Sequence, residues 1–197
     1  MVEDLLIPKQ EYLSAGIHIG MKSGTKDMKK FIYKVREDGL SILNLQLLDE
    51  RIRVAAKFLA NIEKILVVGR KLNAHTAIRK FSEVVGCDCI IGRFMPGTLT
   101  NPKYEKFMEP EVILLTDPLS DRQALKEAVA MRIPVVALCD TFNETKNVDL
   151  IIPCNNKGKR SLALVYWLLA REILKNRGKK SFEYTLEDFM EGEEVSG

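Results

Sequence analysis

The sequence predicts an α/β fold: a three-layer α/β/α domain with a doubly wound, five-stranded parallel sheet at its centre. Short apolar runs alternate along the chain with longer segments in which apolar residues recur at helical spacing. The short runs show no alternation of polar and apolar residues, which is typical of parallel strands covered on both faces. Crossovers between such strands are right-handed. We therefore expect one domain over residues 1–180.

The first 45 or so residues are expected to form a basic N-terminal extension with a hairpin. Segments 31–35 and 40–43 flank Asp38-Gly39, a pair that favours a tight turn between two strands. A helix over about 46–61 follows, with one buried face, because Leu48, Ile52 and Ala55 begin a run of apolar residues at helical spacing.

The remaining elements alternate between strand and helix. Asn73 is expected to cap a helix that ends at Val85, and Ser120 with Gln123 is expected to form a capping box for the next helix. The last helix is expected from Ser161 to about residue 176, apolar nearly all round and therefore well covered. The five strands are expected at residues 65–68, 89–91, 112–115, 134–138 and 150–152.

Composition indicates a globular protein of the cytoplasm. The chain has 197 residues, 46% of them hydrophobic, and no apolar run approaches the roughly 20 residues of a membrane span. The start, Met-Val-Glu-Asp-Leu-Leu, lacks the features of a signal peptide. The four cysteines lie in or beside predicted strands, which fits reduced, buried thiols.

The charge is divided unevenly along the chain. The net charge is +3, but residues 181–197 hold six acidic residues and no Lys or Arg, so residues 1–180 carry +9. A basic body suggests a polyanionic partner, although a solvated surface with chance asymmetry is the simpler alternative. The acidic tail 181–197 is expected to be disordered alone. Its apolar residues could dock on a partner protein, and they are Phe182, Tyr184, Leu186 and Phe189.

The loop over residues 92–102 carries groups that bind phosphates and riboses. Two Gly and two Pro exclude a helix or a central strand there. Arg93 supplies a fixed positive charge, and Phe94 is a candidate for stacking on a base. An ordinary long loop is the alternative. Hydroxyl and amide groups that could fix the position of the protein on a nucleic acid are those of Thr98, Thr100 and Asn101.

Further cations follow the strands of the predicted sheet and precede its last helix. Arg70 and Lys71 follow the first strand, where they could hold phosphates or pair with Asp117. Phosphate at the start of the last helix would be held by helix N–H groups together with cations. The candidates there are Asn156, Lys157, Lys159 and Arg160. The basic extension adds Lys22, Lys26, Lys29, Lys30 and Arg36.

Evidence for catalysis is weak, so no catalytic residue, metal or cofactor is expected. The turn after the first strand has one glycine where the dinucleotide fingerprint needs three, and no phosphate-loop motif occurs. His18 and His75 lie in no recognisable nucleophile motif. Cys87-Asp-Cys89 is isolated and lacks the second pair of a zinc site. Asp117 and Asp140 could form a carboxylate pair, but turn chemistry also explains Asp117.

Several segments together resemble one family. They occur in order at residues 12–20, 31–39, 92–102, 110–118, 140–141 and 153–157. This series resembles the S-two family of small-subunit ribosomal proteins, which is shared with the laminin receptor precursor. Only a few residues separate the Asn101 loop from the strand after Pro110, so the helical arm of bacterial members is absent and the chain looks like the archaeal type.

The resemblance implies a flavodoxin-like strand order, 2-1-3-4-5, and a structural role. A member of the family would bind small-subunit rRNA and neighbouring ribosomal proteins at the back of the subunit, between head and body, and support assembly and translation. It would not be an enzyme. The alternatives are an α/β enzyme that binds a nucleotide or sugar phosphate at residues 69–71, and a protein-interaction module that acts through the acidic tail.

Overall fold

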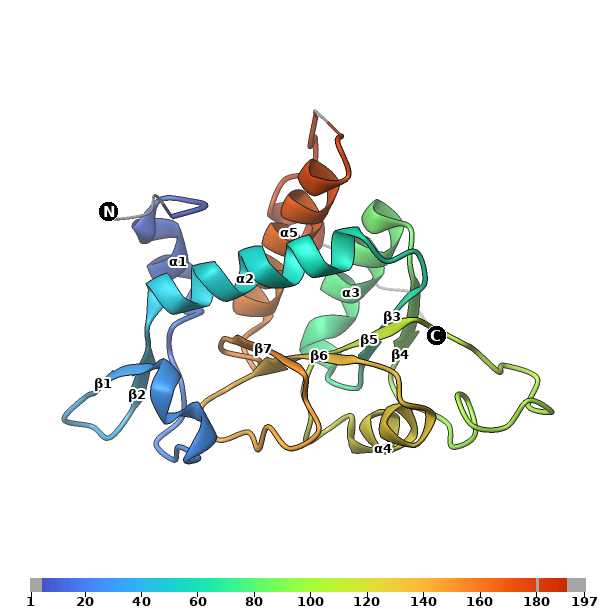
Figure 1. The fold of residues 1–197 in the computed structure, drawn as a ribbon. Helices are drawn as coiled ribbons and strands as arrows, with labels where there is room; N and C mark the ends of the chain where they lie inside the picture. The colour runs from blue at the N-terminus through green and yellow to red at the C-terminus, as the bar shows by residue number, and fades with distance from the viewer. Residues whose placement is uncertain (1–4, 180, 191–197) are drawn as a thin grey trace.

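The computed structural model describes residues 5–179 and 181–190. Its centre is a parallel sheet with the strand order β4-β3-β5-β6-β7 (Figure 1). Numbered within the sheet, this order is 2-1-3-4-5, so the expected flavodoxin-like topology is confirmed. The strands are β3 (Ile65–Gly69), β4 (Asp88–Ile91), β5 (Val112–Leu115), β6 (Val135–Cys139) and β7 (Leu150–Pro153).

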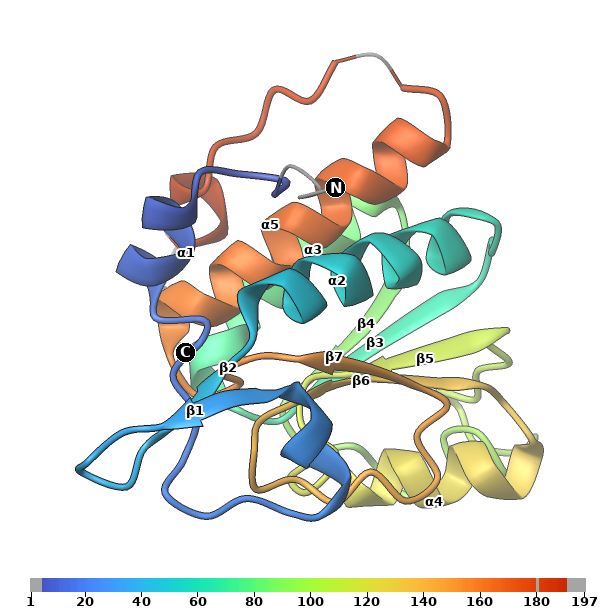
Figure 2. The same cartoon turned by 60° about the vertical axis from the view of Figure 1, so that its left-hand side comes forward.

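Three helices cover one face of the sheet and a single helix covers the other (Figures 1 and 2). Side chains alternate along each strand, so Ile65 and Val67 pack towards the three helices while Leu66 and Val68 pack towards the single helix. The three helices are α2 (Leu45–Ala60), α3 (Leu72–Val85) and α5 (Lys159–Asn176), and the single helix is α4 (Arg122–Met131). Twelve residues of α5 are buried, which confirms that this apolar helix is well covered.

Irregular segments complete the face that α4 covers. One helix of ten residues is too narrow to shield a five-stranded sheet, and the exposed apolar surface needs further cover. Phe94 and Leu99 of the loop after β4, together with Met28 and Phe31 of the N-terminal extension, are buried in this second core cluster. The loop after β4 is therefore a structural cover as well as a candidate site.

The N-terminal extension contains the expected hairpin and a short helix that the sequence analysis did not predict. Strands β1 (Ile32–Val35) and β2 (Ser41–Leu43) pair antiparallel after the 3-10 turn η1 (Asp27–Phe31). Helix α1 (Lys9–Ala15) is tied to α2 because the hydroxyl of the buried Tyr12 donates a hydrogen bond to Asp49. This contact joins residues far apart in sequence, so local patterns gave no sign of it.

Two predicted helix caps are wrong. Asn73 belongs to the first turn of α3 instead of preceding the helix, and its side chain donates to the carbonyl of Lys157 at 2.9 Å. The hydroxyl of Ser120 donates to Asp117 at 2.8 Å instead of capping α4, and the residue before that helix is Asp121. In each place the side chain bonds to another group: Asn73 to a carbonyl far along the chain, and Ser120 to a carboxylate three residues earlier.

Residues 181–190 form a C-terminal strap against α3 and α5, so the expected disorder is wrong for these residues. Phe189 is only 1% exposed and belongs to the main core cluster. Trp167 Nε1 donates to the carbonyl of Tyr184 at 2.9 Å, and the rings of Trp167, Phe182 and Tyr184 pack edge to face. Phe182, Tyr184 and Leu186 are partly buried against the same cluster. Residues 191–197 lie outside the described part.

No helix among the described residues is both long enough and apolar enough to span a membrane.

Candidate nucleic-acid interface

The residues that follow the parallel strands lie together at the carboxyl edge of the sheet, where ligands of doubly wound folds bind. This edge divides into two regions that differ in chemistry. We call the first the closed network, made of Lys71, Asp117, Asn143 and Asn156. We call the second the arginine pocket. It is lined by Arg70, Arg93, Phe94, Pro96, Ser120, Asp121 and Gln123.

In the closed network, the ammonium group of Lys71 is held inside the protein. Its Nζ lies 2.8 Å from Asp117 Oδ2, 3.0 Å from the carbonyl oxygen of Asn156 and 3.1 Å from Asn156 Oδ1. Asn143 Nδ2 donates to the other oxygen of Asp117 at 2.8 Å, and Asn156 Nδ2 donates to Asn143 at 3.0 Å. Asp117, Asn143 and Asn156 are at most 2% exposed. The three donors of Lys71 are thus used internally.

This network decides between the two expectations for Lys71. The lysine pairs with Asp117, and the side chain of Asn156 is inaccessible, so neither is available to hold a phosphate. Burial raises the pKa of the Asp117 carboxyl, but the hydrogen bond and charge of Lys71 outweigh it, so the pKa lies below its usual value. Asp117 also accepts from the N–H of Leu119 at 3.1 Å, which confirms its turn chemistry.

Gly69 serves packing at this edge. A Cβ atom at this position would lie 2.2 Å from Ile78 Cδ1 and 2.6 Å from Thr116 Oγ1. The absence of a side chain lets α3 and β5 approach β3 closely.

The loop after β4 is held by Glu127, a residue that the sequence analysis did not single out as part of the site. Its carboxylate, at the buried face of α4, accepts from the N–H groups of Gly97 at 2.8 Å and Leu99 at 3.1 Å. It also accepts from Gln123 Nε2 at 2.8 Å. A glutamate on the inward side of an otherwise apolar helix face was the signal available in the sequence.

The structure corrects two of the candidates in this loop. Phe94 is 6% exposed and packs beneath the loop, so its ring cannot stack on a base in this structure. Thr98 is 2% exposed, and its hydroxyl donates to the carbonyl of Met95 at 2.6 Å. Arg93, Thr100 and Asn101 are exposed.

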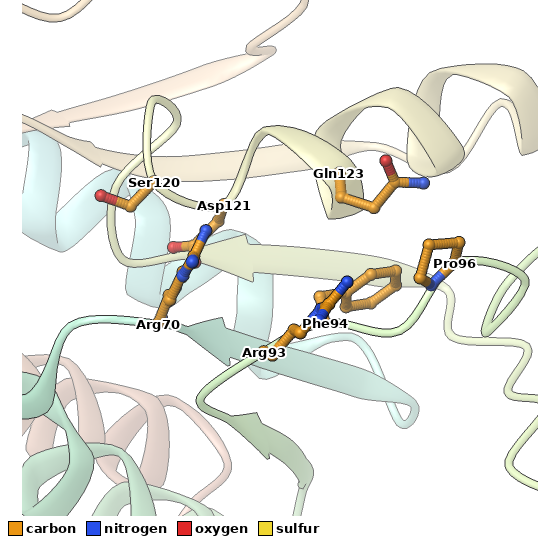
Figure 3. A pocket seen from close by; sticks show the side chains of 7 residues that line it. All are labelled: Arg70, Arg93, Phe94, Pro96, Ser120, Asp121 and Gln123. Atoms are coloured by element: carbon orange, nitrogen blue, oxygen red, sulfur yellow. The ribbon is translucent and has the colours of Figure 1, made fainter.

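The arginine pocket has a volume of about 210 Å³ at the ends of β3 and β4 and the start of α4 (Figure 3). Arg70 and Arg93 are exposed, and neither guanidinium group has an ion pair or hydrogen bond to another described residue. The backbone N–H of Arg70 donates to Asp121 Oδ1 at 2.9 Å. Burial raises the pKa of Asp121 to about 7, so near neutral pH this carboxyl carries only part of a negative charge.

The cations at the start of α5 fall into two classes. Lys159 and Arg160 are exposed in the first turn, which contains no acidic residue. Lys157 is half-buried, with its Nζ 4.3 Å from the centre of the Phe142 ring and 3.0 Å from Met21 Sδ. Lys157 therefore packs on its own chain, whereas the other two face outwards.

The N-terminal extension presents a basic lobe, which we define as residues 20–43. It projects beside the sheet and carries the β1–β2 hairpin (Figure 2). Its exposed cations are Lys22, Lys26, Lys29, Lys30, Lys34 and Arg36. Arg36 lies 3.7 Å from Asp38 in an exposed pair that contributes little to stability.

The histidines and cysteines give no sign of a reaction centre. His18 is half-buried, its Nδ1 has no hydrogen-bond partner among the described residues, and burial lowers its pKa. Burial raises the pKa of Cys87 to about 11, which keeps this thiol protonated. Within residues 5–179 and 181–190, no three His, Cys, Asp or Glu side chains gather as a metal site would require.

Comparison with known proteins identifies the family. The profile described as ribosomal protein S2 matches residues 12–106 and 103–176. The chain belongs to the ribosomal protein S2 family. It is 53% identical over 195 residues to the small ribosomal subunit protein uS2 of Picrophilus torridus and, equally, to that of Thermoplasma acidophilum. Each alignment covers 96% of this chain and 98% of the relative.

A third relative extends the comparison to another archaeon. The small ribosomal subunit protein uS2 of Haloquadratum walsbyi is 50% identical over 188 residues, which cover 94% of this chain and 67% of that protein. The predicted resemblance to the archaeal type of this family is therefore confirmed.

Proposed function

We propose that the protein is a structural, non-enzymatic constituent of the small ribosomal subunit, where it binds rRNA and neighbouring ribosomal proteins. The observation that carries this proposal is the 53% identity, over nearly the whole of both chains, to proteins named small ribosomal subunit protein uS2. The family resemblance suggests a position at the back of the subunit, between head and body.

The proposed interface consists of the basic lobe, the arginine pocket and the start of α5. Exposed Lys and Arg side chains neutralise phosphates and release counterions, and exposed polar groups fix the register of the protein on the RNA. The candidates that remain accessible are Lys22, Lys26, Lys29, Lys30, Arg36, Arg70, Arg93, Thr100, Asn101, Lys159 and Arg160. Five of the expected residues are left out of this interface, because their side chains are buried or make contacts within the chain: Lys71, Phe94, Thr98, Asn156 and Lys157.

The alternative of an enzyme that binds a small phosphate at residues 69–71 keeps only one of its two cations. Lys71 is committed to Asp117 and Asn156, and Arg70 alone is left to meet a ligand. The hypothesis that the tail is a protein-docking module is weakened in the same way, because Phe189 is buried in its own chain.

Binding to small subunits stripped of this protein tests the proposal. A variant with Gln at Lys22, Lys26, Lys29 and Lys30 should dissociate at lower salt in sucrose gradients. The slope of log K against log salt concentration should fall by about 0.7–0.9 for each phosphate that the variant no longer neutralises. The matched control carries Gln at four exposed lysines outside the candidate set, Lys103, Lys106, Lys126 and Lys146.

Failure of the wild-type protein to sediment with small subunits at any salt concentration would reject the ribosomal role. Equal effects of the two quadruple variants would reject the basic lobe as the interface while leaving the role itself intact.

A further inference from the structure

We propose that the arginine pocket seats one phosphodiester group of the rRNA backbone, which Arg70 and Arg93 hold together. This inference rests on the proposed function, because it assigns a ligand to one part of that interface.

The pocket lies at the topological switch point of the sheet. The chain leaves β3 towards β4 on one side, and β5 lies on the other side of β3. The loops after these strands diverge there and leave a crevice, which is where doubly wound folds bind ligands. Arg70 follows β3, Arg93 follows β4, and Ser120 and Asp121 follow β5, so all three strand ends line the pocket. Figure 3 shows the two arginines across from the start of α4.

The free donors of the pocket suit an anion. Two guanidinium groups line one small pocket without an ion pair or hydrogen bond to any described residue, and their mutual repulsion favours an anion between them. The other polar groups are occupied: the Ser120 hydroxyl donates to Asp117, and Gln123 Nε2 donates to Glu127. Both oxygens of Asp121 accept backbone N–H groups, from Arg70 at 2.9 Å and Asp117 at 3.1 Å. The charged side chains left free are the two arginines, and both are positive.

The size of the pocket limits the ligand to a phosphate and part of its sugar. Its volume of about 210 Å³ is below the roughly 300 Å³ at which small-molecule sites begin. A dinucleotide or a nucleoside diphosphate exceeds it. Rigidity favours binding, because Glu127 fixes the loop that carries Arg93 and the N–H of Arg70 is fixed by Asp121.

The test uses single and double variants, Arg70→Gln and Arg93→Gln, in rebinding to stripped small subunits at several salt concentrations. Arg79→Gln is the matched control, since Arg79 is an exposed arginine of α3 without a partner among the described residues. The double variant should bind about tenfold more weakly, with a salt slope lower by about 0.7–0.9, the value for one phosphate. Arg79→Gln should leave both quantities unchanged.

Three results would overturn the shared seat. A slope lower by about 1.4–1.8 in the double variant would mean that each arginine holds its own phosphate. An unchanged slope would mean that the pocket does not face RNA, and an equal loss in Arg79→Gln would indicate a general charge effect. If the wild-type protein fails to rebind, the ribosomal proposal falls as well, whereas normal rebinding by all variants rejects the pocket alone.

A second measurement separates backbone phosphate from a free phosphate ligand. AMP and inorganic phosphate are titrated into the isolated protein while its thermal unfolding is followed. We expect neither to shift the unfolding temperature at micromolar concentration. A shift with micromolar AMP that the double variant abolishes would assign the pocket to a free nucleotide and overturn the rRNA assignment.

Discussion

The closed network and the arginine pocket lie at the same edge of the sheet, yet they use adjacent residues in opposite ways. The side chain of Lys71 is 22% exposed and bonds to Asp117 and Asn156. Arg70 is exposed, and its guanidinium group is free of other described residues. Successive side chains of an extended segment point to opposite sides. Direction, rather than position at a strand end, therefore decides which cation stabilises the fold and which can meet a ligand.

The largest expected effect comes from breaking the closed network. Lys71→Met should lower the free energy of unfolding by about 3–5 kcal/mol, because it leaves the buried carboxylate of Asp117 without its cation. Chemical denaturation measures this loss. Lys126→Met, at an exposed position of α4, is the control and should change stability by less than about 0.5 kcal/mol. A loss below about 1 kcal/mol in Lys71→Met would show that the network is not structural.

The stability lost in Lys71→Met should depend on pH. The pKa of Asp117 is lowered in the wild type, so its stabilisation is present above its unfolded pKa of about 3.8 and is lost as the pH falls through the folded value. Without Lys71, burial dominates and raises this pKa, so the variant should gain stability as the pH falls from 7 towards 4. The stability gap between the two proteins should therefore narrow on acidification, in denaturation curves recorded at each pH. A constant gap contradicts the assignment.

An intermediate effect is expected from the support of the arginine pocket. Glu127→Ala removes the acceptor for the N–H groups of Gly97 and Leu99, and it should cost about 2 kcal/mol. Subunit binding should weaken with it, since the loop that carries Arg93 loses its anchor. Glu83→Ala is the control, because the side chain of Glu83 is exposed and Lys80 is its one ion-pair partner among the described residues. Full stability in Glu127→Ala would mean that packing alone holds the loop.

The smallest effect on stability is expected in the pocket itself. Arg70→Gln with Arg93→Gln should change the free energy of unfolding by less than about 0.5 kcal/mol, because neither guanidinium group has an ion pair or hydrogen bond to another described residue. Thermal and chemical unfolding of the double variant test this. A loss above about 1 kcal/mol would place both arginines in the fold and remove the contrast with Lys71.

The sequence predicted the architecture well because periodic patterns are local. The five strands, the hairpin and helices α2 to α5 lie close to where apolar spacing and turn or cap residues predicted them, and the family resemblance supplied the strand order. The site was harder to predict. Phe94, Thr98 and Asn156 have the right chemistry for RNA, but contacts from distant elements bury them. Glu127 was overlooked because its partners are backbone groups about 30 residues away.

The tail shows the same limit at larger scale. Its acidic residues suggested disorder, yet Phe182 packs on Trp167 and Phe189 is buried, while the acidic side chains remain exposed at Glu183, Glu187 and Asp188. The composition of the segment does not show that its aromatic residues pack on the protein while its acidic residues face solvent. The tertiary structure shows this.

The C-terminal strap has a consequence for the order in which the protein folds during synthesis. Phe189 follows every strand and long helix along the chain, yet it packs against α3, more than a hundred residues earlier. During synthesis, α3 and α5 leave the ribosome before the residues of the strap that pack on them. Until then Trp167 lacks its carbonyl partner on Tyr184. A nascent chain stalled before the strap should therefore be recognised by chaperones that bind exposed aromatic side chains.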